Sequence, residues 1–444
     1  MWNLGGEVGA DNMTIKPQNL EEQLVWYTIV GTYGFYLIGA QFVWIPAIAY
    51  FLGFRVFRKL WDQTEDTPTE EKIFIPVSVW LWIIAMLIME VALIAAHIDF
   101  DLGWSKMIFT TVNSWARTWA LMALFPLIGC LNIRPQLIYR AACILCLQSL
   151  VVTIICYILH FAKIPDPVYM SPLSIFRGPS SNYMVDLFVL GGDAGEDRQF
   201  RMQLFTNFAN TLGIVGNVYV FLATQEANKR WRRIGMIGAV AMVVGSGSRS
   251  TIFSLAIAPI ITWVLTNFTW PIQIAAGVTS LITGMIAPEL INFLDNTWNR
   301  AIRGYRGSSA LVRKRLEEVA LNRWTEAPIW GHGFVAEKGP KYTEYMPIGS
   351  HNQWPDLLYV RGIVGFIAFL VVMLWSTADL IIKAQKSAIA KTALSIYLVF
   401  WISTLAVDIE ACAYLYWPGL ILTGIAFNQK TSTVLSPIKT YTTT

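Results

Sequence analysis

Long apolar runs are the feature that most constrains this chain. Several exceed the ~18–20 residues that cross a bilayer as a helix, and inside lipid only a helix or a closed barrel satisfies every backbone polar group. Charged residues make up 14% of the 444 residues, against roughly 25% in an ordinary globular chain. The sequence therefore predicts an all-α polytopic membrane protein.

The apolar runs divide into about eleven predicted transmembrane helices. The first is long enough to tilt strongly or to break at Gly31, Gly34 or Gly39. The sixth runs into the small residues from Gly245 to Ser248, so we expect it to end part-way through the membrane. The polar start of the chain predicts no cleavable signal peptide. The predicted spans are residues 24–54, 73–96, 107–131, 139–162, 203–224, 233–247, 250–268, 270–293, 357–382, 391–406 and 410–427.

The basic residues of the short loops predict the orientation, because Lys and Arg collect on the cytoplasmic side of a membrane. One set of short loops carries Lys16, Lys106 and Arg249. The opposite set carries many more, and it is therefore predicted to face the cytoplasm, with the amino terminus outside and the carboxyl terminus inside. Its members are Arg55, Arg58, Lys59, Lys72, Arg134, Arg140, Lys229, Arg230, Arg232, Arg233, Lys383, Lys386, Lys391, Lys430 and Lys439.

This orientation puts two long connections, residues 163–202 and 294–356, outside the membrane. We expect a transmembrane bundle over residues 1–293, a large external catalytic loop with short helices over residues 294–356, and the last spans with a cytoplasmic tail over residues 357–444. The external side holds neither ATP nor nucleotide sugars. Any chemistry there must use substrates delivered through or along the membrane.

The second external loop contains a dense basic run without acidic partners. Arginine presents a fixed fork of donors that matches phosphate oxygens, so the run predicts a phosphate-binding surface. The alternative is a basic face that rests on anionic lipid headgroups. The run comprises Arg300, Arg303, Arg306, Arg313, Lys314 and Arg315.

A second anion site is predicted at Gly245-Ser-Gly-Ser-Arg-Ser-Thr251. An apolar helix starts directly after Ser250, and the free backbone N–H groups at a helix start attract anions. Arg249 lies between apolar helices, and a charge in that position is a functional hypothesis by default. The alternative is an arginine that extends to the membrane interface.

His351 is the candidate general base. It lies in Gly349-Ser-His-Asn-Gln-Trp354, just before the ninth span, and the unperturbed imidazole pKa of about 6.5 suits a base at neutral pH. The alternative is a structural loop histidine. His332 lies in the turn Trp330-Gly-His-Gly333.

Other polar residues in the spans are expected to be structural. Glu90 and Arg117 lie in the outer halves of adjacent spans and are expected to form an ion pair. The five cysteines, including the C-x-x-C pair Cys143 and Cys146, all lie in apolar runs and are expected to pack there. We assign no role to Asp408 and Glu410 in the last outer turn.

Missing motifs narrow the function further. The chain has no G-x-x-x-x-G-K-[ST] loop for ATP, no cluster with metal-ligand spacing and no G-x-S-x-G elbow. We therefore expect no metal, no cofactor and no nucleic-acid partner. The sequence shows no internal repeat or inverted pair of broken spans, which weakens a secondary-transporter interpretation.

Three segments resemble the O-antigen ligase and polymerase superfamily of bacterial glycan assembly. They are the Gly245–Thr251 segment, the segment from Arg315 to Gly333 with its short helix, Pro and Gly-x-Gly run, and Ser350-His-Asn352 followed by Arg361-Gly-Ile-Val-Gly-Phe366. A weaker fourth similarity is Arg201 with Asn210-Thr-Leu-Gly213, where Asn207 is an alternative to Asn210 and the preceding Pro of the family is missing. The spacing before Gly331 leaves Arg313 as an alternative to Arg315.

The resemblance implies a glycosyltransferase on the external (periplasmic) face of the bacterial inner membrane, similar to enzymes of the GT-C class. Its donor would be a glycan linked through pyrophosphate to a polyprenyl lipid such as undecaprenol. The leading hypothesis is a repeat-unit polymerase for O-antigen, capsule or exopolysaccharide, in which a chain-length regulator and a flippase are potential partners. The alternative within the superfamily is an O-antigen ligase that uses lipid A core of lipopolysaccharide as acceptor, and the odd number of spans favours the polymerase. From another class, a flippase or transporter of lipid-linked glycans is a third alternative.

The resemblance also implies roles for individual residues. Arg249 and Arg315 would stabilise charge on the leaving pyrophosphate, and His351 would accept the proton of the acceptor hydroxyl in a metal-independent, inverting transfer. The residues expected to bind substrate are Asn352, Arg201, Arg313, Ser248, Ser250, Asn210, Gly331 and Gly333.

Overall fold

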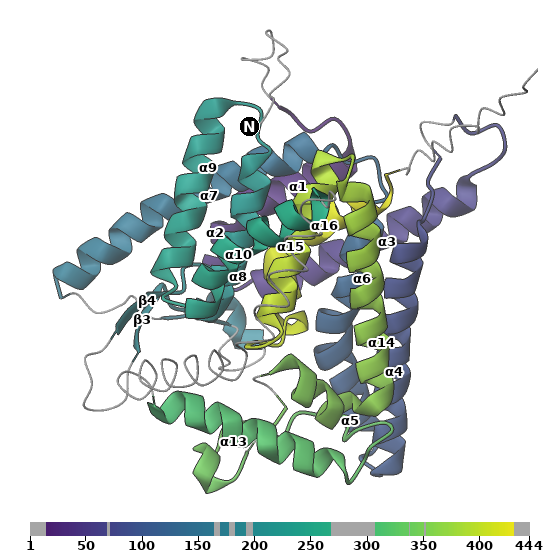
Figure 1. The fold of residues 1–444 in the computed structure, drawn as a ribbon, viewed down its shortest axis with the longest axis vertical. Coiled ribbons are helices and arrows are strands. Elements are labelled where there is room, and N and C mark those ends of the chain that lie inside the picture. The colour runs from purple at the N-terminus through teal and green to yellow at the C-terminus, as the bar shows by residue number, and fades with distance from the viewer. Residues whose placement is uncertain are drawn as a thin grey trace, which may run out of the picture.

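The chain folds into a bundle of tilted helices, with two small hairpins and one long helix at one end (Figure 1). A computed structural model describes residues 15–68, 72–163, 169–176, 183–191, 199–267, 307–336, 338–349 and 352–429. The predicted span at residues 270–293 therefore lies outside the described residues.

Helices make up most of the described structure. Four of them are long and apolar enough to cross a membrane: α4, α7, α10 and α14. The predicted count of about eleven spans stays a prediction. The helices are α1 (Leu20–Val30), α2 (Thr32–Ile38), α3 (Gln41–Asp62), α4 (Val77–Asp99), α5 (Trp104–Thr110), the π-helix η1 (Thr111–Trp119), α6 (Ala120–Ile128), α7 (Pro135–Phe161), the short 3-10 helix η2 (Pro172–Phe176), α8 (Ala209–Thr224), α9 (Lys229–Gly245), α10 (Arg249–Thr266), α13 (Gly307–Trp324), the short 3-10 helix η4 (Lys341–Thr343), α14 (Gln353–Ala384), α15 (Ala388–Ser403), the short 3-10 helix η5 (Glu410–Cys412) and α16 (Ala413–Phe427).

Two antiparallel hairpins lie in the first long connection. The strand β1 (Tyr169–Met170) pairs with β2 (Met184–Val185), and β3 (Phe188–Gly191) pairs with β4 (Gln199–Met202) in a register that joins Val189 to Arg201. The second hairpin positions Arg201 for the site described below.

The first predicted span, residues 24–54, reverses direction within the bundle. Glycine breaks the helix at Gly31 and again at Gly39, whose φ of +77° ends α2. Both ends of the run lie together, because Glu21 at the start of α1 pairs with Lys59 at the end of α3 (2.9 Å). The turn at Gly39 lies at the other end, where Tyr36 Oη donates to the carbonyl of Asp186 (2.9 Å). The predicted break at glycine is confirmed, and the reversal at Gly39 is a feature that the sequence did not predict.

The reversal changes the predicted side of the chain start. Arg134 forms a two-point ion pair with Glu22 (Nη2–Oε2 2.7 Å) and also donates to the carbonyl of Lys16 (2.7 Å). Burial alone would raise the pKa of Glu22, but the hydrogen bonds from Arg134 outweigh it and hold this pKa below its ordinary value. Lys16 therefore lies with the predicted cytoplasmic set and not opposite to it.

The predicted cytoplasmic arginines and lysines do gather at one end of the bundle, here called the basic end. Arg55, Lys59 and Arg134 meet the acidic start of α1 there. Arg140 at the start of α7 pairs with Glu226 in the α8–α9 connection through two bonds (2.7 and 3.0 Å). This grouping was read correctly from the loop charges.

Replacing Arg140 with methionine is expected to destabilise the fold strongly. The Glu226 side chain is 1% exposed, and loss of its partner leaves a buried charge uncompensated, which costs about 3–5 kcal/mol. Arg58→Met is the matched control, because its pair with Asp62 is exposed on both sides and contributes about 0–1 kcal/mol. Thermal unfolding in detergent measures both. Equal shifts for the two variants would contradict the prediction.

Helices α7 and α9 pack closely through the predicted structural cysteines. A methyl group on Gly235 would lie 2.5 Å from Cys143 Sγ, and one on Gly238 would collide with the carbonyl of Cys146. All five cysteines are buried and free. Their expected packing role is confirmed.

Candidate functional site

One end of the bundle collects most of the described candidate residues. We call it the α13 end: there α4, α9 and α15 terminate, α8, α10 and α14 begin, and α13 lies across the lower part of the view in Figure 1. Residues Arg300, Arg303, Arg306, Ser350 and His351 lie outside the described residues.

The turn between α9 and α10 presents an uncapped helix start. Gly247 adopts a φ of +60°, which turns the chain, and Ser248 is the N-cap of α10. The side-chain bond of Ser248 to α10 is to the hydroxyl of Ser250 (3.1 Å), and it does not engage a backbone N–H group. The backbone N–H groups of the first turn thus remain available to an anion. The Arg249 side chain is exposed and has no hydrogen bond or ion pair with any described residue.

Arg201 and Asn210 hold this turn from the side. Arg201 Nε donates to the carbonyl of Ser246 (2.9 Å), and its Nη2 donates to Asn210 Oδ1 (2.7 Å). The structure therefore joins the fourth, weaker motif to the Gly245–Thr251 segment, and Asn210 is the asparagine in contact with Arg201. Both residues were expected to bind substrate; in the structure Arg201 contacts the turn that presents Arg249, and Asn210 contacts Arg201.

Helix α13 is amphipathic and rests on the start of α14. Val312, Leu316 and Ala320 are buried in a small cluster with Tyr359 and Val360 of α14. Its outward side carries the predicted basic residues. Arg313 and Lys314 are exposed, and Arg315 is half-buried with its Nη1 donating to the carbonyl of Tyr342 (3.1 Å).

Asn352 caps the start of α14 and links it to α13. Its backbone N–H donates to Asp356 Oδ2 (2.5 Å), and its Nδ2 lies 3.5 Å from Glu317 Oε2 on α13. Its Oδ1 atom is buried and has no hydrogen-bond partner among the described residues. The convergence of this group and the Arg201–Arg249 group on one ligand stays a prediction.

Gly331 and Gly333 lie in the loop that follows α13, and this loop packs against a kink in α14. The kink lies at Gly362, whose φ is +64°. The carbonyl of Pro328 accepts from the N–H of Ile363 (2.9 Å), and the N–H of Gly333 donates to the carbonyl of Val360 (2.9 Å). The loop thereby satisfies backbone groups that the kink releases. These glycines were expected to bind substrate, but their visible role is this close backbone contact.

Gly331→Ala is expected to destabilise the α13 end. Gly331 has a φ of +69°, and a methyl group there would lie 2.5 Å from the backbone nitrogen of Gly362. The left-handed backbone and the collision together cost about 2–4 kcal/mol. Gly34→Ala is the control, because nothing lies within 4 Å of its added methyl group. Thermal unfolding of both variants tests this, and a wild-type midpoint for Gly331→Ala would contradict it.

A polar cluster beneath the start of α14 was missed by the sequence analysis. Asp408 and Glu410, to which we assigned no role, each bury one carboxylate oxygen that has no hydrogen-bond partner among the described residues. Burial, together with the nearby carboxylates of Glu410 and Asp356, raises the pKa of Asp408 well above its usual range. Arg361 is fully buried beside them. Its position inside an apolar run was the signal that marked Arg249, and it applied here equally.

Glu90 and Arg117, which were expected to form an ion pair, have hydrogen bonds to other residues. Glu90 Oε1 accepts from the Thr111 hydroxyl (2.7 Å). Arg117 donates to the carbonyl of Phe42 (2.8 Å) and to Asn113 Oδ1 (3.3 Å), and its guanidinium lies over the Phe42 ring. Arg117 lies within η1, and Glu90 of α4 is bonded to it through Thr111; η1 interrupts the predicted span at residues 107–131.

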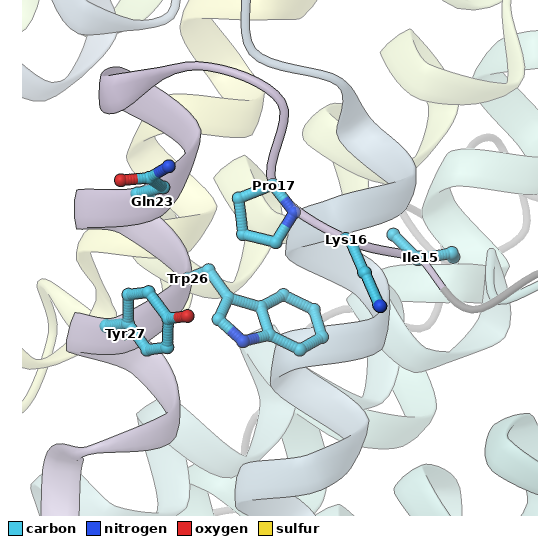
Figure 2. A pocket seen from close by; sticks show the side chains of 6 residues that line it. All are labelled: Ile15, Lys16, Pro17, Gln23, Trp26 and Tyr27. Carbon is cyan, nitrogen blue, oxygen red and sulfur yellow. The ribbon is translucent and has the colours of Figure 1, made fainter.

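A hollow of about 370 Å³ lies at the basic end, beside the start of α1 (Figure 2). It is far along the bundle from Asn352 and the Gly247 turn, so it is not the candidate site. Its lining residues are Ile15, Lys16, Pro17, Gln23, Trp26 and Tyr27.

Residues 234–370 match the family model described as O-antigen ligase. This stretch, called here the O-antigen ligase domain, is similar to that family. No curated protein is significantly similar to the chain. The match supports the predicted superfamily, and together with the long apolar helices it indicates a multi-pass membrane protein of O-antigen ligase or polymerase type.

The O-antigen ligase domain includes the Gly245–Thr251 segment, α13, the Gly331–Gly333 loop and the kinked start of α14. Arg201 and Asn210 precede it in the chain, yet they hold its first turn. The residues preceding the domain therefore contribute to the arrangement of its site.

Proposed function

We propose that the protein transfers a glycan from a polyprenyl pyrophosphate to a sugar hydroxyl at the α13 end, on the external face of the bacterial inner membrane. The observation that carries the proposal is the grouping of the O-antigen ligase domain's polar residues at this end. The exposed Arg249 lies at the uncapped start of α10. The basic helix α13 is joined through Glu317 to Asn352, the residue that follows His351.

The proposed reaction is a single displacement. The acceptor oxygen attacks the anomeric carbon, the bond from that carbon to the phosphate oxygen breaks, and the pyrophosphate leaves with the electron pair. His351 takes the proton of the acceptor hydroxyl, so the configuration at the anomeric carbon inverts. The pyrophosphate linkage already stores the energy of the transfer.

Arg249 and Arg315 are assigned to the leaving group. Charge grows on the pyrophosphate as the bond breaks, and cations placed beforehand at that position lower the barrier. The N-terminus of α10 adds its N–H groups. Arg313 is the alternative to Arg315, and Ser248 and Ser250 lie where they can donate to phosphate oxygens. Asn352 is assigned to orient the base or a substrate hydroxyl.

The two acceptor hypotheses now stand level. The preference for a polymerase depended on an odd number of spans with an external amino terminus. The chain reverses direction within residues 24–54, so this run can no longer be counted as one span, and the preference loses its basis. A repeat-unit polymerase would use a second lipid-linked glycan as acceptor, whereas an O-antigen ligase would use lipid A core. Interaction with a chain-length regulator or a flippase belongs to the polymerase hypothesis.

Purified protein in lipid nanodiscs, given lipid-linked repeat units alone, tests the proposal. Growth of longer lipid-linked chains supports the polymerase, and product only after addition of lipid A core supports the ligase. Excess chelator is expected to leave the rate unchanged. The proposal would be contradicted if neither acceptor gave product while the protein moved the donor across vesicle membranes. The transporter hypothesis would then take its place.

A further inference from the structure

Arg361 is a fully buried cation near the kink of α14. Its Nη2 donates to the hydroxyl and the carbonyl of Ser114 on η1 (3.2 and 3.5 Å). Its Nε and Nη1 atoms are buried without hydrogen-bond partners among the described residues. A buried charge is costly unless opposite charges compensate it.

Two carboxylates supply that compensation from other parts of the fold. Glu90 on α4 and Glu410 on η5 both interact electrostatically with Arg361. Thr111 on η1 also binds Glu90. Arg361 thus joins α14 to η1 through its hydrogen bonds to Ser114, and it lies within electrostatic range of Glu90 on α4 and Glu410 on η5. Turns of π-helix such as η1 occur frequently at functional sites.

The sequence around Arg361 is adapted to this burial. Gly365 stands one turn later on α14, and a methyl group there would collide with the stem of the Arg361 side chain. The second glycine of the Gly362-x-x-Gly365 pattern therefore makes room for the arginine. The first glycine permits the kink onto which the Gly331 loop docks.

The kink separates a short first segment of α14, residues 353–361, from the rest of the helix. Asn352 caps this segment, and His351 precedes it directly in the chain. At its start, Gln353 is fixed to the α15–α16 connection: its N–H donates to the carbonyl of Thr404 (3.2 Å), and its Oε1 accepts from Ile409 (2.7 Å). At its end, Arg361 fixes it to η1. A rigid segment sets the position of whatever its first residues carry.

We propose that Arg361 is a positioning residue for glycan transfer. Together with Glu90 and Glu410 it fixes the direction of the 353–361 segment, and so the placement of the residues at its start. This inference rests on the proposed function. Arg361 does not touch the substrate, so its loss changes the rate of transfer and leaves donor binding almost intact.

Arg361→Met and Arg361→Lys test the proposal, with Lys383→Met as the matched control. Lys383 is a largely buried cation at the other end of the same helix, where it pairs with Asp379 (2.8 Å). Arg361→Met is expected to lower kcat about 10- to 100-fold while KM for the donor changes less than about threefold. Arg361→Lys keeps the charge and is expected to restore part of kcat. Lys383→Met is expected to keep wild-type kcat even where it lowers the unfolding temperature.

A second measurement does not depend on activity. Hydrogen–deuterium exchange of the Gln353 and Ile409 amides reports how firmly the start of the segment is held, because these N–H groups donate to the carbonyl of Thr404 and to Gln353 Oε1. With Arg361 present we expect slow exchange at both amides. With Arg361→Met we expect exchange several-fold faster, because the segment is then held at its start alone.

The two readouts separate the possible failures. No transfer by the wild-type protein with either acceptor overturns the proposed function. An unchanged exchange rate of the Gln353 and Ile409 amides in Arg361→Met overturns the positioning role, whatever the activity. Wild-type kcat in Arg361→Met also overturns it. A folding defect alone is recognised by loss of donor binding, which overturns the assignment as well.

Discussion

His351→Ala is expected to abolish glycan transfer. The acceptor hydroxyl is a weak nucleophile until its proton is removed, and a positioned base contributes typically 10²–10⁴-fold to such a step. We expect a loss of that order in kcat in a nanodisc assay with lipid-linked repeat units, with donor binding retained. Added imidazole is expected to return part of the rate, because it can occupy the space that the ring leaves. The wild-type rate should fall at acid pH, where a protonated imidazole no longer accepts a proton.

His160→Ala is the control for this experiment. His160 lies at the end of α7, and its ring packs on Phe200, apart from the Asn352 group. It is expected to keep the wild-type rate and pH profile. A His351→Ala variant with wild-type activity would show that His351 is not the base. The proposed mechanism would then have no residue that accepts the proton of the acceptor hydroxyl.

Hydropathy predicted most of the described helices, because each membrane-crossing segment must bury its backbone bonds in itself. It did not predict the reversal at Gly39. That turn is covered by the first long connection, because an added methyl group at Gly39 would meet Ser171 and Tyr183. A turn covered by another part of the chain needs no polar residues, so the sequence carries no loop signal there.

In the candidate site, too, the sequence indicated some features and not others. The sequence motifs singled out Arg201, Asn210 and Ser248, and the structure joins Arg201 both to Asn210 and to the carbonyl of Ser246 in the turn before Ser248. The roles of Gly331 and Gly333 could not be read from a pattern, because they depend on a backbone contact with a kink 30 residues later in the chain. The contact of Asn352 with Glu317 has the same long-range origin. For Arg361, the sequence shows that it lies in an apolar run, but it does not show that Ser114 is its hydrogen-bond partner.

Arg249→Ala is expected to lower the transfer rate by about 10²–10³-fold, the usual effect of removing one donor that stabilises developing charge. Arg249 has the geometry for this role. It is exposed at the first turn of α10, where the helix start is uncapped, and it has no partner among the described residues that would hold it away from a ligand. Single-turnover rates with saturating donor measure the effect apart from binding.

The lysine variant and a matched arginine separate charge from geometry. Arg249→Lys keeps the positive charge but loses the two-point fork, so it is expected to recover part of the rate and not all of it. Arg230→Ala is the control, since Arg230 is likewise an exposed arginine in the first turn of a helix, at the basic end of the bundle. It should leave the rate unchanged. If Arg249→Ala and Arg230→Ala behave alike, the cation at the start of α10 does not act on the leaving group. The arginines of α13 would then have to stabilise the pyrophosphate without it.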